Sequence, residues 1–190
     1  MEIDTANKYP GEKYYVKKNC YGQTQIGREL VLLDSYWDRR LLWNDVFNKP
    51  TKPTVGEAFK WLTSRQKDDD DREKTITTFM NIGNLTALLI CGDLVEAGIM
   101  PMPSAEEWAR LIARVGRGAK LGMETCGLIP EGCNQERLCK AFVSLDLALQ
   151  RELDEDEKSA MGYNVIMLEH ALCKINRLKG KHLYNAVNSS

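Results

Sequence analysis

Hydrophobic residues recur at helical spacing along most of the chain, and the longest such run predicts the core. Between residues 72 and 97 they follow each other at intervals of three and four, at Ile76, Met80, Gly83, Ala87, Ile90, Leu94 and Ala97. Other faces of this segment are also apolar, and a helix that is apolar nearly all round is normally buried in a bundle. We therefore expect one core helix over 72–97, ended by Gly98. Gly83 and Gly92 either allow a neighbouring helix to approach closely or mark a break into two helices.

Shorter helices with recognisable caps flank this segment. The apolar spacing predicts further helices over 35–48, 54–65, 104–115, 134–153 and 154–180. Thr54 with Glu57, and Ser104 with Glu107, have the sequence form of a capping box at a helix start. The segment 116–132 holds five glycines and is expected to be an irregular loop.

The last predicted helix begins at an acidic cluster, residues 154–157, which suits the positive end of a helix dipole. Its apolar face is predicted from a regular spacing of four and three, at Met161, Val165, Leu168, Leu172 and Ile175. Gly180 is expected to end this helix.

Together these elements predict an all-α fold, an irregular bundle of six to seven helices. Residues 1–27 show no sustained helical period and are expected to form a non-helical N-terminal arm. Residues 28–180 would then form the helical bundle domain, and residues 181–190 a flexible tail. No convincing strand pattern and no internal repeat interrupts this organisation.

Composition agrees with a globular protein and restricts the site of any charge-driven binding. Of the 190 residues, 43% are hydrophobic and 28% charged, and the net charge is −1. Affinity for nucleic acid must therefore come from a local basic patch. No apolar run reaches the roughly 20 residues of a membrane span, and no secretory signal is recognised. We therefore expect a cytoplasmic protein whose six cysteines are free thiols.

Catalytic motifs are absent from the sequence. There is no GxSxG, Walker A, HExxH or kinase signature, and only two histidines are present. The glycine cluster at 116–122 loosely resembles a dinucleotide fingerprint, but it follows a predicted helix where the fingerprint needs a strand. We therefore predict a non-enzymatic protein without a cofactor. The alternative is an enzyme with an unfamiliar site around Glu169, His170 and Cys173.

Cysteine and histidine residues in the second half raise the question of structural zinc. The candidate ligands are Cys126, Cys133, Cys139, His170 and Cys173. Thiolate and imidazole groups suit zinc. However, the six and five residues between successive cysteines match no standard zinc knuckle. We expect no metal, with Cys139 and Cys173 packed as core thiols and Cys126 and Cys133 incidental.

Basic residues give the one functional signal on which a hypothesis can be built. The candidate nucleic-acid contacts are Arg110, Arg114, Arg117, Lys120, Lys174, Arg177, Lys179 and Lys181. Basic side chains near aromatic ones, as in the N-terminal arm, suit a phosphate backbone and unpaired bases. The alternative is a solvated helix face, with arginines paired to Glu106 and Glu107 and the C-terminal basic residues facing a helix dipole.

The leading hypothesis is a non-enzymatic helical protein that self-associates into a homo-oligomer and contacts RNA. The runner-up is a helical adaptor or regulatory protein that binds another protein through acidic clusters and exposed aromatic residues, among them Trp37, Trp43 and Trp61. A small viral or regulatory protein would suit this size and composition. The residues show no resemblance that names a family.

Overall fold

The computed structural model describes residues 39–67, 75–77, 79 and 82–178, and these are mostly helical. The described elements are α2 (Arg40–Phe47), α3 (Val55–Leu62), β1 (Arg65–Lys67), β2 (Thr75–Thr77), α4 (Asn84–Glu96), α5 (Ala105–Val115), α6 (Ala119–Thr125), α7 (Gln135–Glu152), α8 (Glu155–Met161) and α9 (Val165–Leu178). The predicted helical class is thus confirmed, with eight helices in this part of the chain where six to seven were expected. The predicted arm over 1–27 and tail over 181–190 lie outside the described residues.

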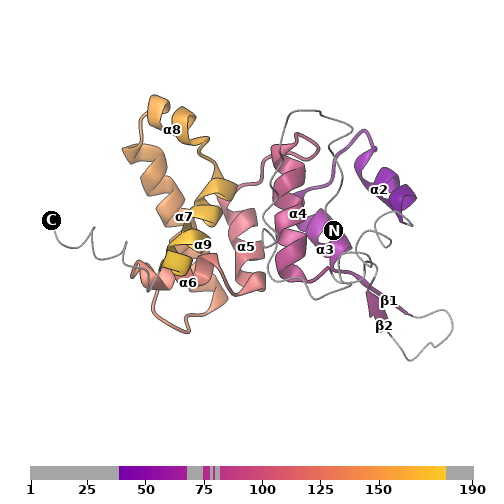
Figure 1. Ribbon diagram of the computed structural model, residues 1–190, viewed down its shortest axis with the longest axis horizontal. Helices are drawn as coiled ribbons and strands as arrows, with labels where there is room; N and C mark the ends of the chain where they lie inside the picture. The colour runs from indigo at the N-terminus through magenta and orange to yellow at the C-terminus, as the bar shows by residue number, and fades with distance from the viewer. Residues whose placement is uncertain (1–38, 68–74, 78, 80–81, 179–190) are drawn as a thin grey trace, which may run out of the picture.

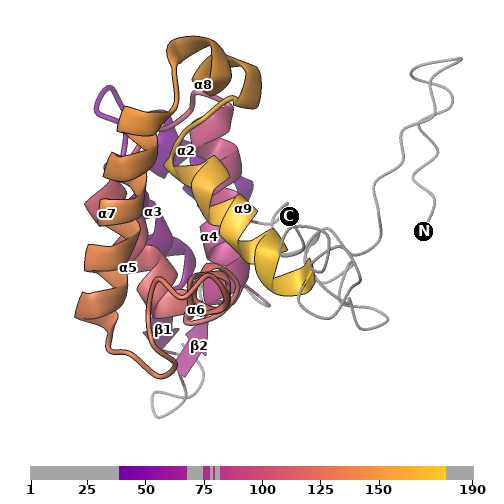
Figure 2. The same ribbon diagram turned by 90° about the vertical axis from the view of Figure 1, so that its left-hand side faces the viewer.

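Helix α5 stands at the centre of the arrangement (Figure 1). It packs against α3, α4, α6, α7 and α9. Its side chains Trp108, Ala109 and Ile112 are almost fully buried, because neighbours cover this short helix on several sides. The β-hairpin and α8 lie at opposite ends of the molecule (Figure 2). Among the described helices, none is long and apolar enough to cross a bilayer.

The prediction of one core helix over 72–97 is wrong at its N-terminal end. Residues 75–77 pair antiparallel with residues 65–67, and α4 begins only at Asn84. The sequence Thr-Ile-Thr is β-branched throughout, which favours a strand over a helix. Gly83 has extended backbone angles, φ −89° and ψ 177°, and forms the N-cap of α4. The break at Gly83, the alternative reading of this glycine, is therefore the observed one.

The glycine-rich segment 116–132 is not wholly irregular, because it contains α6. Gly118, with φ +66°, precedes this helix in a conformation that side chains disfavour. Gly122 lies directly against the backbone of α9: a Cβ atom there would be 2.6 Å from the carbonyl carbon of Leu172. Gly122, one of the glycines from which a loop was predicted, therefore allows α6 and α9 to come into contact.

The last predicted helix is divided into α8 and α9. Gly162, with φ +58°, ends α8 in the left-handed conformation. Asn164 then starts α9, since its Oδ1 accepts hydrogen bonds from the backbone N–H groups of Ile166 (2.9 Å) and Met167 (2.8 Å). Met161, expected on the buried face, is half exposed at the end of α8.

The caps predicted at α3, α5 and α8 are present, with one difference, and Asn134 also caps α7. Thr54 forms the full capping box with Glu57. Ser104 accepts a hydrogen bond from the Glu107 backbone N–H at 3.2 Å, but the Glu107 carboxylate does not complete a box. Its Oε1 accepts instead from the backbone N–H of Gly56 at 3.0 Å, near the start of α3. This carboxylate therefore joins α5 to α3.

Aromatic residues of α2 and α3 pack against one another and against Phe79, which precedes α4. Trp43, Phe47, Trp61 and Phe79 form one cluster with ring centroids 4.7–5.7 Å apart. Such tilted and edge contacts are favourable for aromatic pairs. Trp43 and Trp61, considered as exposed docking residues, are half-buried in this cluster, whereas Trp37 lies outside the described residues.

Thiol reactivity is expected to separate buried from exposed cysteines. Cys91 is fully buried in α4, and burial raises the pKa of its thiol to about 12. Because the thiolate is the reactive form, Cys91 should resist iodoacetamide at pH 8 in the folded protein, whereas exposed Cys126 should be alkylated. Peptide mass spectrometry before and after unfolding measures both sites. Labelling of Cys91 as fast as Cys126 under native conditions would contradict the described packing of α4.

Candidate nucleic-acid interface

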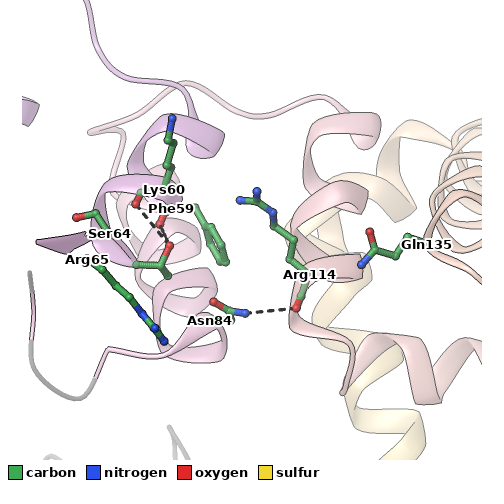
Figure 3. Close-up of a pocket in the computed structure, with 8 residues that line it drawn as sticks. Phe59, Lys60, Ser64, Arg65, Asn84, Arg114 and Gln135 are labelled. Carbon is green, nitrogen blue, oxygen red and sulfur yellow. Dashed lines mark hydrogen bonds between the residues drawn. The ribbon is translucent and has the colours of Figure 1, made fainter. Parts of the chain in front are cut away.

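An open groove of about 640 Å³ lies between α3 and β1 on one side and α5 on the other (Figure 3). Its lining residues are Phe59, Lys60, Thr63, Ser64, Arg65, Asn84, Arg114 and Gln135. Three of them are cationic, and none of these described lining residues is acidic. In Figure 3 Arg114 extends from α5 towards α3, while Lys60 and Arg65 lie on the opposite wall and point to different ends of the groove.

Arg114 is positioned by contacts with α3 and with the start of α4. Its guanidinium carbon lies 6.0 Å from the centroid of the Phe59 ring, a distance at which cation and ring attract each other. Its backbone carbonyl accepts a hydrogen bond from Asn84 Nδ2 at 3.4 Å. Within the described part of the chain, no carboxylate forms an ion pair with Arg114, Lys60 or Arg65.

Two of these cations lie at the C-terminal ends of neighbouring helices. Lys60 lies in the last turn of α3 and Arg114 in the last turn of α5. The Glu107 carboxylate fixes the opposite ends of the same two helices through Gly56. Asn84 and Gln135 are the first residues of α4 and α7. Helix N-termini carry partial positive charge and favour an anion, whereas the partial negative charge at the C-terminal ends of α3 and α5 is offset by Lys60 and Arg114.

The other predicted basic residues do not line this groove where the structure describes them. Arg110 faces a separate depression of about 420 Å³ between α5 and α7, beside Glu106 and Cys139. Lys120 lies 3.8 Å from Glu124, and Arg117 and Lys174 are exposed elsewhere. The Arg177 side chain, Lys179 and Lys181 are outside the described residues.

The sequence pattern did not indicate Lys60 and Arg65. Both are far from Arg114 along the chain, and neither belongs to a run of basic residues. Only the packing of α3 against α5 brings them to the same groove. Lys60 lies in the last turn of α3, where a basic residue complements the helix dipole. This local role gives no indication that Lys60 shares a surface with Arg114.

The candidate zinc ligands and the candidate catalytic group give no comparable site. All five zinc candidates are described, and no three His, Cys, Asp or Glu side chains of the described chain cluster so that they could hold a metal ion. His170 Nε2 lies 3.6 Å from Oε2 of the buried Glu169, its neighbour on α9. Cys173 is half-buried on the same helix, where its Sγ would be 3.2 Å from a Cβ atom on Gly118.

The groove is thus the feature of the described structure with the clearest binding chemistry. It offers cationic hydrogen-bond donors on two facing walls, beside neutral hydroxyl and carboxamide groups. Comparisons of the chain with models of protein families, with curated proteins and with solved structures find no match.

Proposed function

We propose that this is a non-enzymatic helical protein that binds single-stranded RNA through its phosphate backbone. The observation that carries the proposal is the groove in which Lys60, Arg65 and Arg114 face each other without a described carboxylate partner. Lysine and arginine side chains are the usual contacts of nucleic-acid phosphates. Since the whole chain has a net charge of −1, attraction for a polyanion must be local, as in this groove.

The groove favours a strand over an isolated anion. Lys60 and Arg65 point to different ends of it, so the cations are spread along its length (Figure 3). Phe59, the aromatic residue of the lining, is only 1% exposed and therefore provides no surface for base stacking. Binding should then depend on the backbone and be strongly weakened by salt.

The first test removes the three positive charges of the groove. Fluorescence anisotropy with a labelled U12 RNA, measured from 25 to 200 mM salt, should give a slope of log affinity against log salt of about −2, from about −0.7 per phosphate contact. Replacing Lys60, Arg65 and Arg114 by Gln should bring the slope close to zero and weaken binding at least about tenfold at the lowest salt.

A matched variant distinguishes the effect of the groove cations from the effect of the total charge of the protein. Lys140→Gln, Arg151→Gln and Lys158→Gln remove the same number of charges from α7 and α8, away from the groove lining. This variant should keep the slope and affinity of the original protein. Equal losses in both triple variants, or no salt-dependent binding of the original protein, would contradict the proposal.

The wider basic surface and self-association are further parts of the proposal. Arg110, Arg117, Lys120 and Lys174 would lengthen the contact if the strand continues beyond the groove. A longer RNA would then give a slope steeper than about −2, and replacing these four residues would bring it back towards that value. Light scattering on a sizing column reports the oligomeric state and any co-purifying nucleic acid together.

A further inference from the structure

We propose that the groove selects RNA over DNA because two of its side chains accept a hydrogen bond from the ribose 2′-hydroxyl. This inference rests on the proposed function, since it concerns the same groove and the same ligand. It goes further by assigning the selection to Thr63 and Asn84, neither of which is charged.

The hydroxyl of Thr63 already donates its hydrogen within the protein. Its Oγ1 donates to the backbone carbonyl of Phe59 at 2.8 Å, one turn earlier in α3. A hydroxyl has a single hydrogen to donate and two lone pairs that accept. Thr63 therefore meets a ligand in the groove as a hydrogen-bond acceptor. The neighbouring Ser64 hydroxyl is committed in the same way, to the carbonyl of Trp61 at 2.7 Å.

Asn84, at the start of α4, presents a second acceptor to the groove. Its Nδ2 donates to the backbone carbonyl of Arg114 at 3.4 Å. This contact orients the carboxamide, with the amino group towards α5. Its Oδ1, which can only accept, then faces away from α5 and is available to a ligand, beside the second N–H of Nδ2.

The groove thus combines cationic donors with neutral acceptors. A phosphodiester backbone built on deoxyribose has only acceptors, so it satisfies Lys60, Arg65 and Arg114 but offers no donor to the Thr63 hydroxyl or to Asn84 Oδ1. The 2′-hydroxyl of RNA adds one donor per nucleotide. A neutral hydrogen bond of this kind should change affinity by about three- to tenfold.

Three labelled oligonucleotides test the inference with the full chain at one low salt concentration. U12 and dU12 differ only at the 2′ position, and 2′-O-methyl U12 lacks the donor but retains an oxygen there. We expect U12 to bind about three- to tenfold more tightly than either of the others. Equal affinity for all three would overturn the inference and leave the proposed function standing. Tight binding of 2′-O-methyl U12 with weak binding of dU12 would also overturn it, because sugar shape would then be the property recognised. Failure of all three to bind would overturn the proposed function itself.

Substitution of Thr63 tests the assigned residue. Thr63→Val preserves side-chain shape and should weaken U12 binding about threefold while leaving dU12 binding unchanged. Thr125→Val is the matched control, because Thr125 Oγ1 makes the same one-turn bond, to the Leu121 carbonyl at 2.8 Å, on α6. The control should retain the U12 to dU12 ratio, and thermal unfolding of both variants verifies that they are folded. An unchanged ratio in both Thr63→Val and Asn84→Leu would overturn the assignment.

Discussion

Replacing Gly122 by Ala is expected to lower the free energy of unfolding by about 3 kcal/mol. A Cβ atom at this position would lie 2.6 Å from the carbonyl carbon and 3.0 Å from the Cα atom of Leu172, and closer still to the carbonyl oxygen. These are backbone atoms of a long helix, so no side-chain rotation relieves the overlap, and α6 must move away from α9. The extensive contact between these two helices would be lost in part.

Gly92→Ala is the matched control for this prediction. Gly92 is also a helix glycine, but a Cβ atom there would meet Ile166 Cγ2 at 3.4 Å, an ordinary contact with a side-chain methyl. Alanine also favours a helix interior over glycine by about 1 kcal/mol, so this variant should unfold within about 1 kcal/mol of the original protein. Urea denaturation followed by circular dichroism gives both values. Equal stability of the two variants would contradict the described approach of α6 to α9.

The sequence predicted the elements whose signals are local. Thr54, Ser104 and Asn134 each start a helix where a side-chain oxygen can accept a backbone hydrogen bond, and the structure has these caps. The periodic apolar residues of α5 and α7 are likewise buried or partly buried. Local chemistry decides such features, so one sequence is enough to find them.

Glycines were the main source of error because their roles depend on distant neighbours. Five glycines in 116–132 indicated a loop, yet Gly122 is a contact point that only the position of Leu172 explains. Gly83 and Gly162 interrupt apolar patterns that otherwise read as continuous helices. Apolar periodicity alone cannot distinguish one long helix from two elements that bury their faces against the same core.

The candidate site was predictable only in its chemical character. Basic residues near Arg114 indicated an anion-binding surface, but the partners that line its groove, Lys60 and Arg65, come from a different part of the chain. Their approach depends on how α3 packs on α5, which no local pattern encodes. A carboxylate that seemed part of a simple cap, Glu107, proves to be one of the contacts that sets this packing.

Glu107→Ala is expected to lower the free energy of unfolding by about 2 kcal/mol. The change leaves the partly buried N–H of Gly56 without its 3.0 Å acceptor and removes a negative charge from the start of α3. Glu107→Gln retains an acceptor without the charge and should lose about half as much. Glu106→Ala, next in sequence and exposed on the surface of α5, is the control and should be the mildest of the three changes. Chemical denaturation measures all three variants.

Glu107→Ala is also expected to weaken RNA binding without changing the dependence of binding on salt. Gly56 and Glu107 lie near the beginnings of α3 and α5, whereas Lys60 and Arg114 lie near their ends. Loss of the contact would let the two walls of the groove shift, which should reduce U12 affinity about threefold. The number of cations is unchanged, so the slope of log affinity against log salt should remain about −2. A reduced slope in Glu107→Ala would mean that a phosphate contact itself is lost, and unaltered affinity in a destabilised variant would mean that this carboxylate supports the fold but not the groove.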